Sequence, residues 1–152
     1  KQENAPETPV EAQPMTRADA VQALYEDAGS PAASGASFTD VSGDAAYAQA
    51  VAWAAQNGIA AGNGDGTFAP NAPVTREQLA VMLSRYAALQ GRALSAGQDA
   101  LNACSDAASV SGWAQSGVAQ VLNGGLLTAE NGQFAPKATA MTDELANALA
   151  QL

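Results

Sequence analysis

The chain has 152 residues, a formal net charge of −9, a pI of about 4.1, no histidine and one cysteine. Its six basic residues are too few for the clustered Lys/Arg face that nucleic acids require, so we expect no nucleic-acid partner. The lack of histidine removes most zinc sites and every His-based catalytic triad, and a single cysteine cannot form an internal disulfide. No run approaches the ~20 apolar residues of a membrane span. Because no paired carboxylates indicate acid–base catalysis either, we expect a protein that is not an enzyme and holds no metal or cofactor.

Alanine makes up about half of the apolar residues, with 38 copies in the chain. Alanine has the highest helix propensity but buries little surface per residue. The composition therefore predicts closely packed helices around a thin core. Residues 1–14 are rich in proline and glutamate and predict a disordered linker or tail.

An internal repeat organises the rest of the chain. Residues 38–41 (FTDV) recur 66 residues later as CSDA, and residues 66–70 (GTFAP) recur at the same spacing as GQFAP. Around the Asn-Gly pairs at Asn57 and Asn123 the spacing is 66 or 67, which predicts a one-residue insertion that is later compensated. A third element occurs three times, as residues 16–19 (TRAD), 75–78 (TREQ) and 141–144 (MTDE). A period of this length is typical of repeat architectures.

The repeat divides the chain into two full units, residues 38–97 and 98–152, after a closing helix and connector at residues 15–37. Thr16 and Thr75 are good N-caps, and the residue three positions later can complete a capping box. Three helices that begin at the third element carry apolar residues at i, i+3 and i+4, so we expect them to pack as a central bundle. The predicted helices cover residues 16–28, 44–57, 75–89, 110–123 and 141–152.

The motifs FTDV, AVAWAAQNGI, GNGDGTFAP and VTREQL, in this order over residues 38–89, resemble the S-layer homology repeat. Residues 104–152 look like a divergent copy. The resemblance implies an all-α, pseudo-threefold fold, with a central three-helix bundle, outward helical prongs and Gly-rich loops. It implies a secreted module on the bacterial surface that binds the cell wall non-covalently. The implied ligand is a secondary cell-wall polysaccharide, often pyruvylated, or peptidoglycan.

The same resemblance implies that ligand lies in grooves between repeats, with the arginine of the third element as the main anion contact. Arginine matches a carboxylate bidentately, and a helix N-terminus adds free N–H groups. The matching positions for ligand binding are Arg17, Arg76, Thr16, Thr75, Asp40, Asp106, Trp113, Gly64, Asp65 and Gly66.

Several of these residues also have a purely structural interpretation. The arginines can pair with nearby carboxylates, and Asp40 and Asp106 can cap the turns that follow them. Trp53 is expected in the core, and Cys104 occupies an apolar position that predicts a buried, inert thiol.

The third copy of the Thr-Arg element has no arginine. This departure keeps an alternative open, in which the chain is a secreted protein-interaction module that has lost polysaccharide binding. Such a module would associate with itself as a homo-oligomer or bind a protein partner.

Overall fold

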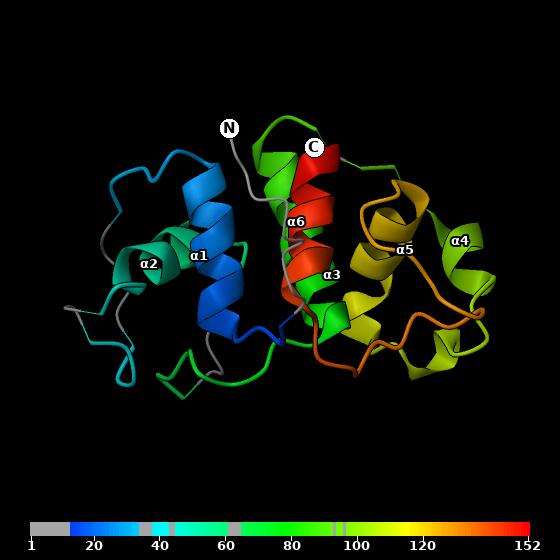
Figure 1. Cartoon of the computed structure of the whole chain (residues 1–152), viewed down its shortest axis with the longest axis horizontal. Helices are drawn as coiled ribbons and strands as arrows, with labels where there is room; N and C mark the ends of the chain where they lie inside the picture. Colours follow the sequence, from blue (N-terminus) through cyan, green and yellow to red (C-terminus); the bar gives the residue numbers. More distant parts are fainter. Residues whose placement is uncertain (1–12, 34–37, 43–44, 61–64, 93, 96) are drawn as a thin grey trace.

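The computed structural model describes residues 13–33, 38–42, 45–60, 65–92, 94–95 and 97–152 (Figure 1). Within these residues the chain is helical and has isolated β-bridges but no strand, which confirms the all-α prediction. The described elements are α1 (Arg17–Asp27), α2 (Ala48–Gln56), α3 (Arg76–Leu89), α4 (Gln98–Asn102), η1 (Ala107–Ser109), η2 (Gly112–Ala114), α5 (Gln115–Asn123) and α6 (Thr142–Gln151).

Thr16 and Thr75 are the N-caps of α1 and α3, as the sequence predicts. Each threonine hydroxyl accepts a hydrogen bond from the backbone three residues later, and both capping boxes are complete. Helices α2 and α5 begin at Ala48 and Gln115, later than the predicted starts at residues 44 and 110. Before α5 the backbone is extended at Val110 and Ser111, because the Ser111 N–H donates to the Glu77 carboxylate instead of a helical carbonyl. The short helix α4 was not predicted.

Three backbone segments meet in a closed ring at the N-terminal ends of α1, α3 and α6. Met15 N–H donates to Ala140 O (3.0 Å), Ala140 N–H donates to Val74 O (2.8 Å), and Val74 N–H donates to Met15 O (3.0 Å). Each of the three residues lies two positions before its helix. The ring therefore gives this end of the molecule its threefold character.

The most extensive helix packing is between α3 and α5, between α4 and α5, and between α1 and α2. Figure 1 shows α1 and α2 on one side of the molecule and α4 and α5 on the other, with α3 and α6 between them. Trp53 of α2 is 4% exposed and contacts Tyr25 and Tyr86 edge-on, at ring-centroid distances of 5.7 and 5.9 Å. The prediction of a core role for Trp53 is confirmed, and this side chain joins α1, α2 and α3.

The predicted change of spacing within the repeat is also confirmed. Helix α5 lies 67 residues after α2, and Gly58 and Gly125, at the same spacing, both turn with positive φ (70° and 76°). In the Phe-Ala-Pro loops the spacing returns to 66, since Ala69 and Ala135 share an unusual φ of 59° and 58°. The extra residue therefore lies before α5, in the region of the two 3-10 turns.

Cys104 is 6% exposed, and burial raises the pKa of its thiol, in agreement with the predicted inert side chain. Across the described ranges, no helix combines the length and hydropathy needed to cross a bilayer. In the same ranges, no three Cys, Asp or Glu side chains gather as a metal site would require.

Candidate functional site

Each repeated arginine is stacked on a phenylalanine of the unit that follows it. The Arg17 guanidinium lies 4.5 Å from the centroid of the Phe68 ring, and its Nε donates to Phe68 O (2.9 Å). Arg76 repeats the arrangement at 4.4 Å from the Phe134 centroid, and its Nη1 donates to Phe134 O. Both arginines are at least nine-tenths buried. Each one therefore ties the start of a helix to the loop of the next unit.

Asp40 and Asp106 hold those same loops from within their own unit. The two carboxylate oxygens of Asp40 accept from the N–H groups of Phe68 and Ala69, both at 2.8 Å. Asp106 binds Phe134 N–H (2.9 Å) and Ala135 N–H (2.8 Å) in the same way. Both carboxylates therefore clamp a loop that begins 28 residues later. The side chain of Asp106 does not cap η1, which follows it.

The remaining predicted site residues are spread over the structure. The Thr16 and Thr75 hydroxyls accept the capping bonds described above. Asp65 accepts from Thr67 N–H (3.0 Å) and the Thr67 hydroxyl (2.5 Å), and Gly66 O accepts from Thr39 N–H (2.8 Å). Trp113 stands 61% exposed on η2, and Gly64 lies outside the described residues.

A groove of about 740 Å³ opens between the loop that follows α5 and the length of α6, from Asp143 to Gln151. Of the predicted site residues that the structure describes, Arg76 is the one that lines this groove. The others in its wall were missed by the sequence analysis and are mostly polar. They include Thr128, Glu130, Asn131, Gln133, Asp143, Glu144, Asn147 and Gln151.

Arg76 is held at the groove by three internal acceptors. Its Nε donates to Glu144 Oε2 (2.7 Å), its Nη2 donates to Thr128 O (2.8 Å), and its Nη1 donates to Phe134 O. The Arg76 and Glu144 side chains are 10% and 22% exposed. Three of the five guanidinium N–H donors are therefore engaged within the protein.

Glu144 also closes the capping box of α6, because its Oε1 accepts from Met141 N–H (2.9 Å). The sequence carries a signal for this capping role, because Glu144 stands three residues after Met141, at the N3 position of a capping box. Its pairing with Arg76, 68 residues earlier, had no sequence signal.

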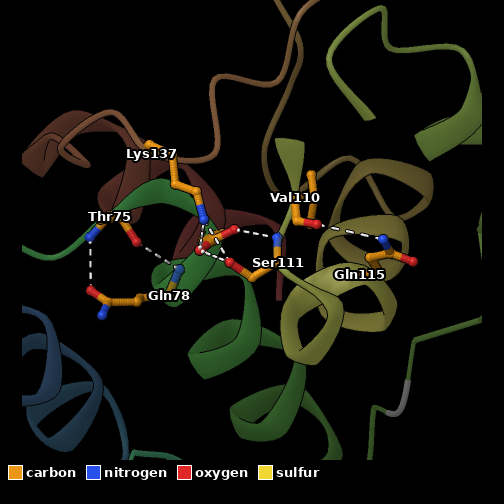
Figure 2. Close-up of polar contacts among 7 residues, drawn as sticks. Thr75, Gln78, Val110, Ser111, Gln115 and Lys137 are labelled. Carbon is orange, nitrogen blue, oxygen red and sulfur yellow. Dashed lines mark hydrogen bonds and ion pairs between the residues drawn. The ribbon is translucent and has the colours of Figure 1, made fainter. Parts of the chain in front are cut away.

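Next to Arg76, Glu77 anchors a second polar cluster through Ser111 and Lys137, both labelled in Figure 2. Its buried carboxylate accepts from Ser111 N–H (2.9 Å), the Ser111 hydroxyl (2.8 Å) and Lys137 Nζ (2.9 Å). Burial alone would raise the pKa of Glu77, but the bonds from Ser111 and Lys137 outweigh it, so that the pKa is lowered. The cluster fastens both the segment before α5 and the Lys137 loop to α3.

Acid is expected to destabilise the protein through these carboxylates. The N–H of Phe68 lowers the pKa of Asp40, and hydrogen bonds also lower the pKa values of Asp65 and Glu77. A carboxyl whose pKa is lower in the folded than in the unfolded state adds stability above its unfolded pKa of about 4. That contribution is lost as the pH falls through the folded value. We expect the urea midpoint to fall between pH 5 and pH 3.

The variant Asp40→Asn provides the control, because it removes one of these titrating groups. Its urea midpoint should change less between pH 5 and pH 3 than that of the wild type. A wild-type urea midpoint that stays constant or rises as the pH falls from 5 to 3 would contradict the prediction. Protonation would then stabilise the protein more, by relieving repulsion among the negative charges of a chain of charge −9, than it destabilises the protein through these carboxylates.

Comparison with known proteins finds one matching family model and several structurally similar chains. Residues 37–80 match the S-layer homology domain family. The fold resembles part of a solved structure, the undecaheme cytochrome from the S-layer of Carboxydothermus ferrireducens, with a TM-score of 0.52 and 17% sequence identity. The match covers 91% of this chain but 17% of the cytochrome chain, and at this identity it supports the fold alone. Among curated proteins, none matches the chain.

Proposed function

Because the chain carries an S-layer homology domain over residues 37–80, we propose that it is a non-catalytic module that binds glycan of the bacterial cell wall non-covalently. The family match supports the broader role, which is anchoring at the cell surface. Binding of a secondary cell-wall polysaccharide or of peptidoglycan, and secretion to reach it, are the finer parts of the proposal. In this view residues 38–97 and 98–152 are two units that follow the closing helix of a third.

The groove beside α6 is the observation that carries the proposal. It is large enough for several sugar residues, and it lies where the Arg76 element of one unit meets the loop of the next. Its side-chain amides both donate and accept hydrogen bonds, as the hydroxyl groups of a glycan require. Outside the groove, the exposed indole of Trp113 offers a flat apolar face that suits the apolar side of a sugar ring.

Co-sedimentation with purified cell walls of the producing bacterium tests the proposal, with walls used before and after removal of their secondary polysaccharide. The wild-type chain should sediment with at least one of the two preparations. The variant Asn147→Tyr places a large side chain in the groove from an exposed position on α6, and it should weaken sedimentation by about tenfold or more.

The matched control is Asn102→Tyr, at an exposed helical position on α4 that does not line the groove. This variant should sediment like the wild type. The proposal fails if wild-type protein binds neither wall preparation. If both tyrosine variants sediment equally well, the groove is not the binding site.

The alternative function, a protein-interaction module, is favoured by one specific observation. At the third position equivalent to Arg17 and Arg76 the chain has Thr142, whose hydroxyl accepts from Gln13 N–H (3.0 Å). Light scattering separates the two functions. A chain that self-associates and does not bind cell walls would favour the interaction module. A monomer that sediments with cell walls would contradict it.

A further inference from the structure

The charge of the α6 groove differs from what an anion-binding site needs. Its wall contains the carboxylates of Glu130, Asp143 and Glu144 and the guanidinium of Arg76, which amounts to a formal charge of −2. Glu144 is paired with Arg76 at 2.7 Å, so the positive charge of the arginine is already balanced inside the protein. The charge that acts on a ligand in the groove therefore comes mainly from the remaining two carboxylates.

Glu130 and Asp143 are those two carboxylates. Both are exposed, and neither forms an ion pair within the part of the chain that the structure describes. Glu130 lies in the loop after α5, and Asp143 lies in the first turn of α6. Both residues line the groove, so a carboxylate bound in it is repelled by both.

We propose that this groove takes an uncharged stretch of glycan and discriminates against sugars that bear carboxylates, such as pyruvate ketals or uronic acids. Glu130 and Asp143 are the residues that set this specificity. The inference rests on the proposed function, because it names the class of glycan for the same groove. It runs against the anionic ligand that the arginine by itself would indicate.

The uncharged part of the groove wall fits such a ligand. Asn131, Gln133, Asn147 and Gln151 present neutral amides, which pair with hydroxyl and N-acetyl groups without removing a charge from water. The contacts that hold Arg76 to Phe134 O and Thr128 O turn two of its remaining donors toward the protein as well.

The test compares the binding of the chain to native cell walls and to the same walls after their carboxylates have been amidated. Amidation should strengthen wild-type binding. The double variant Glu130→Gln/Asp143→Asn removes the two groove charges and leaves the Arg76–Glu144 pair intact. It should bind native walls roughly fivefold more tightly than the wild type, with little change on amidated walls.

A matched control separates the groove from the net charge of the whole chain. The double variant Glu26→Gln/Asp99→Asn removes the same two charges from exposed positions outside the groove, and it should bind native walls like the wild type. The inference is overturned if amidation weakens wild-type binding, or if the two double variants change binding equally. If no wall preparation is bound at all, the proposed function fails, and the inference fails with it.

Discussion

Replacing Trp53 with alanine is expected to lower the free energy of unfolding by about 4 kcal/mol, as is typical when a large buried aromatic side chain is removed. Trp53 is 4% exposed and lies between Tyr25 of α1 and Tyr86 of α3. In a chain so rich in alanine, few large side chains can close the cavity that would remain. Urea unfolding followed by far-UV circular dichroism measures the loss.

The second tryptophan provides the control for this experiment. Trp113 is 61% exposed on η2, so Trp113→Ala should change the free energy of unfolding by less than about 0.5 kcal/mol. Equal losses for the two variants would show that Trp53 is not the side chain that joins the first three helices. Because Trp113 is also proposed to face sugar, its variant has a second use in the co-sedimentation assay.

Replacing Arg76 with leucine is expected to cost about 3 kcal/mol, because it removes one partner of a largely buried ion pair. The change leaves the Glu144 carboxylate without its cation and takes donors away from Phe134 O and Thr128 O. It also removes the guanidinium from the Phe134 ring. Differences in urea midpoint, at an unchanged slope, measure the effect.

Two further variants show what Arg76 contributes. Arg76→Lys keeps the positive charge but cannot reach three acceptors from one planar group, so it should recover only part of the loss. Arg92→Leu replaces an exposed arginine and should change stability by less than about 0.5 kcal/mol. A loss below about 1 kcal/mol for Arg76→Leu would contradict a structural role for the pair.

The structural role of Arg76 affects how the groove can be studied. Because the same guanidinium holds the groove walls together, loss of wall binding in an Arg76 variant would not distinguish a damaged fold from a lost ligand contact. Asn147 lines the groove from an exposed helical position, and Glu130 and Asp143 carry its exposed charges. These three residues therefore separate recognition from stability better than the arginine does.

Much of the local structure followed from the sequence. The caps at Thr16 and Thr75, the buried faces of the helices they begin and the core position of Trp53 were all predicted. The spacings of 66 and 67 residues predicted which loops of the two units are equivalent. These features were predictable because capping and apolar periodicity depend on residues within one or two helical turns of each other.

The tertiary structure decided the features that bear on the site. The ring through Met15, Val74 and Ala140 brings the starts of three helices together from across the chain. It thereby places Glu144 against Arg76, although the two are 68 residues apart. No local sequence pattern predicts the contact between Arg76 and Glu144, because it depends on how the units pack against one another. The sequence left two roles open for this arginine, contact with an anionic ligand and pairing with a carboxylate of the protein. The fold gives it an internal carboxylate partner, Glu144, in a groove of net negative charge.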